Sequence, residues 1–120
     1  MVIMIIDPDT KQLTHTKAYL EKNNVKAVAF RDPMEAVQYG YNHAVDAVYT
    51  EVVMPHITGR DVVNLLRKRN SDIRAYFLSD TDRYLEAGKA CRIAGYYIKP
   101  LRDDLQNANL LTSPAVTGTK

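Results

Sequence analysis

Polar side chains stand at the ends of four short apolar segments, and their types suggest a shared site. They are Asp7, Glu51, Ser79 and Lys99. Two carboxylates, a hydroxyl and an ammonium suit a divalent cation or a phosphoryl group. The same residue types also suit a buried lysine–carboxylate ion pair with a purely structural role. The residue types alone leave both interpretations open.

The segments that lead to these residues are short and rich in β-branched or aromatic residues, as buried strands are. Five such segments are predicted as strands, at 2–6, 25–30, 45–50, 73–78 and 96–98. Their alternation with helical patterns predicts an α/β fold, a doubly wound five-stranded parallel sheet with right-handed crossovers. Because parallel strands end at one edge of the sheet, we expect the four polar residues to converge there.

Apolar residues at helical spacing predict a helix after each of the first four strands. Asp32 with Pro33 and Glu35 has the composition of a helix start, and Thr58 can cap the next helix. The expected buried faces contain Leu13 and Leu20; Ala36, Val37 and Tyr41; and Val62, Val63, Leu65 and Leu66. The fourth helix is predicted to pass through Tyr84, Leu85, Ala87, Cys91 and Ile93 and to end at Gly95.

The end of the chain is expected to differ from the rest. A last helix is predicted over 101–111, whereas 112–120 has no periodicity and suggests a flexible tail or linker. We therefore expect one domain over 1–111, which suits a chain of 120 residues.

Composition excludes several classes of protein. The chain is 46% hydrophobic and 25% charged, with a formal net charge of +2, as ordinary globular chains are. This charge gives no reason to expect nucleic-acid binding, and the basic run 67–69 is expected to end a helix. The apolar stretch 1–6 is too short for a signal peptide or a membrane span. We expect a cytoplasmic protein that binds neither nucleic acid nor membrane.

Cysteine and histidine offer no clear site. Cys91 is the only cysteine, so an internal disulfide and a cysteine-based zinc site are excluded, and burial is expected. His15, His43 and His56 have no spacing that forms a metal site on one helix face, although His56 lies near the presumed site.

Ser79 has no base beside it in the sequence, so a nucleophilic triad is unsupported. We expect no enzymatic activity.

Two motifs form a specific combination. One has Met54-Pro55 with Gly59 four residues on, and the other runs Gly95-Tyr96-Tyr97-Ile98-Lys99-Pro100. With Asp7 and Ser79, they make residues 1 to about 111 resemble the receiver domain of bacterial two-component response regulators. The resemblance implies a flavodoxin-like sheet of order 2-1-3-4-5, a role in phosphorelay signal transduction, and a cis Lys99–Pro100 bond.

The resemblance also implies roles for individual residues. In that family an aspartate after the third strand accepts a phosphoryl group from a histidine kinase, and Glu51 stands at its position. Lys99 matches the lysine that contacts the phosphoryl group. Ser79 and Tyr96 match the switch hydroxyl and the switch aromatic residue.

Magnesium binding is expected to be weak or absent. The family holds the ion with two acids after the first strand, the acceptor and a backbone carbonyl, which would be that of Val53. Asp7 is in place, but Pro8 occupies the second acidic position and has no side-chain oxygen. Asp9 is an alternative, one residue further on. The extra methylene of Glu51 moves its oxygens, and a misplacement of about 1 Å can cost ~100-fold in phosphoryl transfer. No cofactor is therefore expected.

Three functions follow from these residues. The first is an atypical receiver, a pseudo-receiver, that acts by protein–protein contact. In it a Glu51–Lys99 ion pair either imitates the phosphorylated state or is only structural. The second is a magnesium-dependent phosphoryl acceptor that uses Glu51 or Asp9. The third, an unrelated flavodoxin-like small-molecule binder, is disfavoured because no glycine-rich loop follows Ile6.

The resemblance further suggests partners. A histidine kinase or an output domain is the expected protein partner. The face formed by the fourth helix and the last strand, near Tyr84 and Tyr96, is a candidate surface for contact or homodimerisation. Alternatively, these tyrosines are half-buried cover for the sheet.

Overall fold

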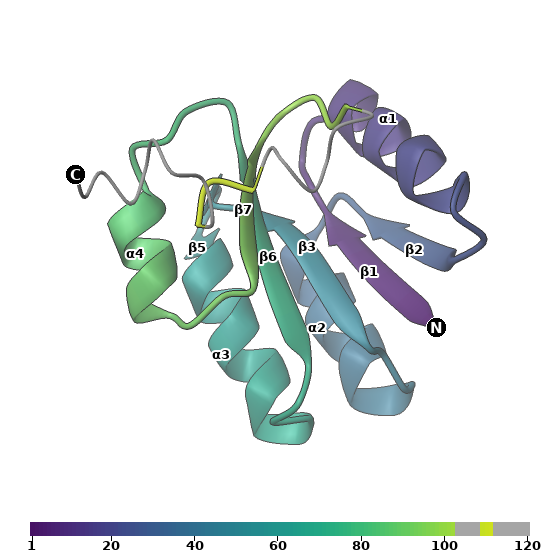
Figure 1. The fold of residues 1–120 in the computed structure, drawn as a ribbon. Coiled ribbons are helices and arrows are strands. Elements are labelled where there is room, and N and C mark those ends of the chain that lie inside the picture. Colours follow the sequence, from purple (N-terminus) through teal and green to yellow (C-terminus); the bar gives the residue numbers. More distant parts are fainter. Residues whose placement is uncertain (103–108, 112–120) are drawn as a thin grey trace.

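The computed structural model describes residues 1–102 and 109–111, and every structural statement below refers to these residues. Five parallel strands form the central sheet in the order β2-β1-β3-β6-β7 (Figure 1). Their bounds are β1 Val2–Ile6, β2 Lys26–Phe30, β3 Ala47–Glu51, β6 Arg74–Ser79 and β7 Gly95–Ile98. The predicted doubly wound fold and its strand order are therefore confirmed.

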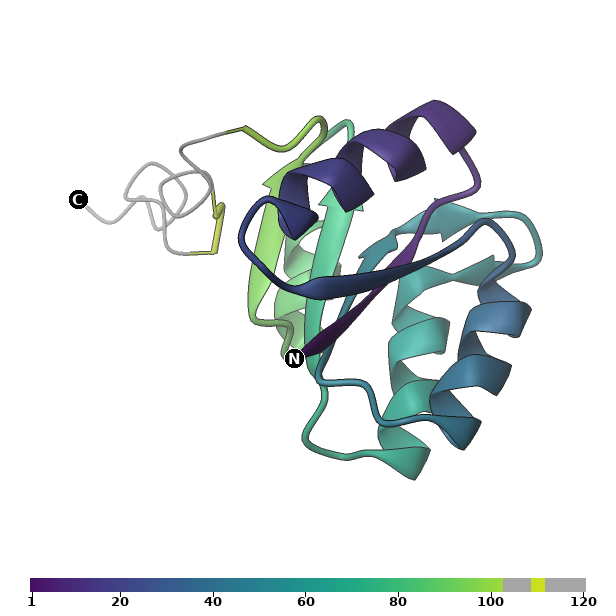
Figure 2. The same cartoon turned by 90° about the vertical axis from the view of Figure 1, so that its right-hand side faces the viewer.

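Helices cover both faces of the sheet. Their bounds are α1 Thr10–Glu21, α2 Pro33–Asn42, α3 Gly59–Arg69 and α4 Leu85–Ala90. In the view turned by 90°, α1 lies on one side of the sheet and α2 and α3 on the other (Figure 2). The core accordingly has two parts. Leu13 and Leu20 of α1 pack with Ile5, while Val37 of α2 and Val62 of α3 pack with the opposite face.

The double cover explains why β1 is apolar at every position. Met4, Ile5 and Ile6 are each fully buried, although neighbouring side chains point to opposite faces. β1 pairs with β2 on one side and with β3 on the other. The strand is therefore an interior strand of the sheet, and it delivers Asp7 to the carboxyl edge beside the end of β3.

The predicted helix starts at α2 and α3 are confirmed. The Asp32 side chain accepts a hydrogen bond from Met34 N, and Pro33 begins α2. Thr58 and Asp61 form a reciprocal capping box at the start of α3. Each cap satisfies backbone N–H groups that a helix leaves without partners.

Some predicted bounds and faces are wrong. α4 ends at Ala90, with Cys91 as its C-cap, and Gly95 belongs to β7. Tyr41 is 39% exposed and is not part of the buried face of α2, because its hydroxyl reaches out to donate to Leu65 O. The helix predicted over 101–111 lies mostly outside the described residues, and the tail 112–120 lies wholly outside them.

A small hairpin was not predicted. It consists of β4 Val53–Met54 and β5 Ile57–Thr58, which pair antiparallel between β3 and α3. Strands of two residues are too short to show a period. His56 at its turn has a φ of 70°, a left-handed conformation that is uncommon for residues other than glycine. The hairpin lies beside the carboxyl end of β3.

Candidate functional site

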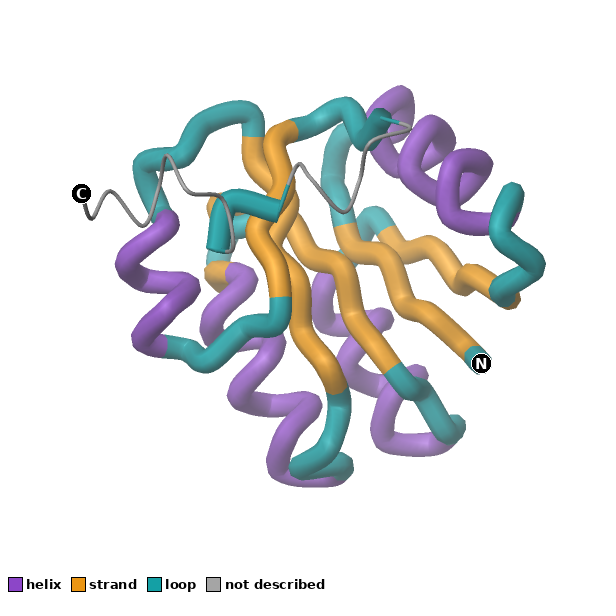
Figure 3. Tube along the Cα trace, viewed as in Figure 1, coloured by secondary structure: helices purple, strands orange, loops and turns teal. Residues whose placement is uncertain are grey.

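The four polar residues singled out in the sequence stand at one edge of the sheet. The register pairs Ile6 of β1 with Thr50 of β3, Glu51 with Leu78 of β6, and Ser79 with Ile98 of β7. Neighbouring strands thus end at nearly the same level, and their following loops gather there (Figure 3).

Lys99 bridges two carboxylates at this edge. Its Nζ lies 2.7 Å from Asp7 Oδ2 and 2.6 Å from Glu51 Oε1. The side chains are nearly closed off from water, with 7% of Lys99, 2% of Asp7 and 15% of Glu51 exposed. Two anions and one cation leave this cluster with one net negative charge.

The remaining carboxylate oxygens also have partners. Asp7 Oδ1 accepts from Asp9 N at 3.0 Å. Glu51 Oε2 accepts from Val52 N at 2.7 Å and from Val53 N at 3.3 Å. Every carboxylate oxygen of Asp7 and Glu51 therefore accepts at least one hydrogen bond, which is how buried charged groups are stabilised.

The lysine is held in its charged form. Burial alone lowers the pKa of Lys99, but hydrogen bonds and charges from Asp7 and Glu51 outweigh burial, so the pKa lies above its ordinary value. The arrangement is thus an ion-pair cluster around an ammonium that is charged at neutral pH.

The backbone geometry around Glu51 depends on Gly59. Gly59 N donates to Val52 O at 2.8 Å. A Cβ on Gly59 would lie 2.5 Å from the carbonyl oxygen of Glu51, far inside any real contact. The close approach of α3 to the end of β3 requires glycine here, which gives a physical reason for glycine in that motif.

Ser79 and Tyr96 hold the loop after β6. Ser79 Oγ accepts from Thr81 N at 3.3 Å. Tyr96 is completely buried, and its hydroxyl donates to Thr81 O at 2.7 Å and accepts from Tyr84 N at 3.3 Å. Burial raises the pKa of this phenol. Tyr96 is thus completely buried and not half-buried as expected, so its ring adds no exposed surface to the face formed by the fourth helix and the last strand.

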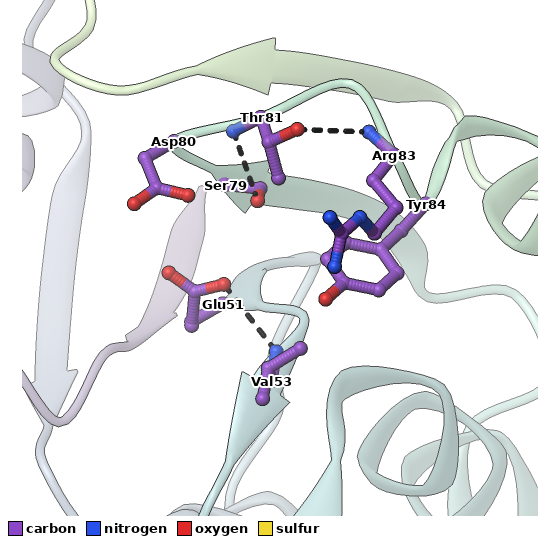
Figure 4. Close-up of a pocket in the computed structure, with 7 residues that line it drawn as sticks. All are labelled: Glu51, Val53, Ser79, Asp80, Thr81, Arg83 and Tyr84. Carbon is purple, nitrogen blue, oxygen red and sulfur yellow. Dashed lines mark hydrogen bonds between the residues drawn. The ribbon is translucent and has the colours of Figure 1, made fainter.

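A pocket of about 430 Å³ opens beside the ion-pair cluster (Figure 4). In this view Glu51 faces Asp80 across the opening, and Arg83 and Tyr84 form another wall. The lining residues are Glu51, Val53, Ser79, Asp80, Thr81, Arg83 and Tyr84. Sequence reasoning missed Thr81 and Arg83. Their position directly after the strand that ends in Ser79 was the available signal.

The predicted magnesium ligands do not form a cation site that fits this ion. Asp9 turns to α1, where its Oδ1 accepts from Gln12 N at 3.1 Å. Pro8 supplies no side-chain oxygen, and the carboxylates of Asp7 and Glu51 are already paired with Lys99. Among the described residues, no group of three His, Cys, Asp or Glu side chains could hold a metal.

The other candidate residues lie apart from this edge or have structural roles. His15 Nε2 lies 3.1 Å from Leu101 O, and His43 stacks on Tyr39 with ring centroids 4.0 Å apart. Cys91 is buried, as predicted. The Lys99–Pro100 peptide bond is cis. Over the part of the chain that is described, no helix is long and apolar enough to span a membrane.

Comparisons with known proteins identify relatives of this chain. A family model described as "response regulator receiver domain" matches residues 3–109. No curated protein sequence matches significantly.

Solved structures share the fold. The chemotaxis protein CheY4 of Vibrio cholerae has 18% identity and a TM-score of 0.77, with 88% of this chain and 91% of that chain covered. TrrA of Thermotoga maritima, in complex with Mg²⁺ and BeF, has 21% identity and a TM-score of 0.78, covering 88% and 92%. The receiver domain of the Francisella response regulator 1452 has 24% identity and a TM-score of 0.75, covering 92% and 94%. Identities this low show a shared fold and nothing finer.

Proposed function

Because this chain belongs to the family of response regulator receiver domains, we propose that it signals by protein contact, without phosphoryl transfer. Glu51 takes the place of the phospho-acceptor aspartate, and Lys99 forms ion pairs with the carboxylates of Asp7 and Glu51. The domain has no catalytic activity of its own in this proposal. Its partners are a histidine kinase or an output domain, and its compartment is the cytoplasm.

The arrangement of the carboxylate oxygens is the observation that supports this proposal most strongly. An acceptor must present a free oxygen in line with the incoming phosphorus. Glu51 Oε1 is 2.6 Å from Lys99 Nζ, and Glu51 Oε2 accepts from Val52 N and Val53 N. Using either oxygen as a nucleophile weakens contacts that stabilise the buried negative charge.

The loop after β6 supports a constitutive signalling state. Ser79 shares a pocket with Glu51, and Tyr96 is fully buried with its hydroxyl on Thr81 O and Tyr84 N. In our proposal the negative charge of Glu51, next to Lys99, keeps Ser79 and Tyr96 in this arrangement without an added phosphoryl group.

Magnesium is expected to bind weakly or not at all. It favours octahedral oxygen coordination and gives up its water reluctantly. To enter this site it must compete with an ammonium that already lies between both carboxylates. Its candidate ligands, Asp7, Glu51 and the Val53 carbonyl, lack the acid that Pro8 replaces.

Intact-mass spectrometry after incubation with acetyl phosphate and magnesium tests the proposal, alongside a magnesium titration. We expect no phosphoryl adduct and no saturable binding. A matched variant combines Pro8→Asp with Glu51→Asp, which restores both acids that the family resemblance implies. This variant is expected to bind magnesium and take up one phosphoryl group. An adduct on Glu51 or Asp9 of the unaltered chain would show that the domain is still a phospho-switch.

A further inference from the structure

A second hollow, here called the groove, shares no lining residue with the pocket of Glu51 and Ser79. Three loops form it: those after β1 and β2, and the turn of the β4–β5 hairpin. These loops gather at the right-hand side of Figure 2. The groove has a volume of about 400 Å³ and is lined by Pro8, Arg31, Asp32, Pro33, Met34, Pro55, His56 and Ile57.

The groove is apolar and exposed. Three prolines give it stiff walls, and Met34 is 51% exposed at its edge. In the described part of the chain, the exposed large apolar residues are Met1, Met34, Tyr41 and Val53, and of these Met34 lines the groove. An exposed apolar side chain at the edge of an apolar hollow marks an interaction surface.

Two residues of opposite charge, Arg31 and Asp32, line the rim of the groove, and they differ in their contacts. Arg31 is exposed, and its guanidinium makes no ion pair or hydrogen bond within the described residues. Neighbouring Asp32 already accepts from Met34 N at the start of α2, where the helix dipole favours its charge. The N–H groups of the Arg31 guanidinium are therefore unpaired within the described residues and lie beside the apolar lining of the groove. A carboxylate is the best partner for a guanidinium, because it can accept two of these N–H groups at once.

We propose that this groove docks a segment of a partner protein that carries a large aliphatic or aromatic side chain next to an acidic residue. The apolar side chain packs among Pro8, Met34 and Ile57, and the carboxylate pairs with Arg31. The inference rests on the proposed function, in which the domain works by protein contact, and it names a surface for that contact. The docking surface is separate from the pocket of Glu51 and Ser79.

Selection from a displayed library of random 12-residue peptides, with the full chain as the target, tests this inference. We expect the enriched peptides to place Asp or Glu within about three residues of Leu, Ile, Met or Phe. Arg31→Glu and Met34→Ser should each weaken binding of the best peptide about tenfold or more. Arg31→Glu should also shift a repeated selection towards Lys and Arg. Both residues are exposed, so neither variant threatens the fold.

A control variant is Lys68→Glu, which makes the same charge change at an exposed position in the last turn of α3. It should leave peptide binding unchanged. Peptides without the acidic–apolar pattern, or binding that neither groove variant weakens, would overturn the inference. So would self-association abolished by Met34→Ser, because the groove would then hold a second copy of the chain. A small organic acid that co-purifies and is released by Arg31→Glu would also overturn it.

The two proposals fail in different experiments. A phosphoryl adduct on Glu51 removes the proposed function but leaves a positive peptide selection standing. A failed peptide selection with an unmodified mass removes only the docking groove.

Discussion

Lys99 Nζ and Glu51 Oε1 lie 2.6 Å apart, and only 7% of the lysine side chain is exposed to water. At this distance the contact is a charge-assisted hydrogen bond. The second ion pair of the same ammonium, with Asp7, joins residues 92 positions apart in the chain.

Removal of the ammonium should destabilise the fold strongly. Lys99→Met leaves Asp7 and Glu51 close together without a cation, and loss of one partner of a buried pair costs about 3 kcal/mol or more. Urea unfolding measures the change. The control Lys89→Met removes an exposed pair with Glu86, at 3.3 Å, and should change stability by less than about 1 kcal/mol. Equal effects of the two variants would mean that the Lys99 cluster contributes nothing special.

Stability should fall in alkaline solution. The pKa of Lys99 is raised above 10.5, and burial raises the pKa values of Tyr49 and Tyr97 above 10.0. The folded chain then holds more protons than the unfolded chain at high pH, so the free energy of unfolding declines as pH rises. Because the folded pKa values are raised, these contributions are fully present below about pH 10 and are lost above it. Urea unfolding across this range measures the slope.

The Tyr49→Phe variant shows how much of the decline in the free energy of unfolding comes from one phenol. Tyr49→Phe removes a phenol whose ring stacks on Tyr76, with centroids 4.4 Å apart, and keeps the ring itself. The alkaline decline should become shallower in this variant. Stability that instead increases above about pH 10 would contradict the raised pKa values.

Glu51→Gln should separate a phosphoryl mimic from a structural ion pair. The amide has one donor end, so either Lys99 or the N–H groups of Val52 and Val53 lose an acceptor, at a cost of about 1–3 kcal/mol. If Glu51 imitates a phosphoryl group, the NMR amide signals of Thr81 and Tyr84 should also shift, because Ser79 and Tyr96 hold that loop. Reduced stability with an unchanged loop would leave the ion pair as a structural element only.

Gly59→Ala should destabilise the fold by pushing against the backbone of Glu51 and Val52. The added methyl group meets the Glu51 carbonyl oxygen at 2.5 Å and Val52 Cα at 3.2 Å. Backbone atoms cannot move aside cheaply, so we expect a loss of about 1–3 kcal/mol in spite of the better helix propensity of alanine. Gly88→Ala is the control. Its methyl group also meets an atom at 2.5 Å, but that atom is the flexible end of Ile93. Thermal unfolding that ranks Gly88→Ala as the costlier change would refute this argument.

Local patterns in the amino-acid sequence were enough to predict the architecture and the edge of the sheet at which the site lies. Continuous apolar runs such as β1 reveal strands covered on both faces, and the helix starts at Asp32 and Thr58 depend on side chains within three residues. Such short-range signals can be read without knowing which distant residues pack against these elements. Placing Asp7, Glu51, Ser79 and Lys99 at one edge then needed only the rule that parallel strands end together.

Contacts between separate elements of the fold determine which atoms meet at the site and which side chains turn away from it. Asp9 lies two residues from Asp7 but caps α1, since the chain turns into the helix there. Tyr96 points inward, where its hydroxyl donates to Thr81 O, a contact between residues on different elements. Lys99 bridges Asp7 and Glu51 only after β7, β1 and β3 are aligned. Local pattern carries no information about such contacts, because their energy exists only once the sheet has assembled.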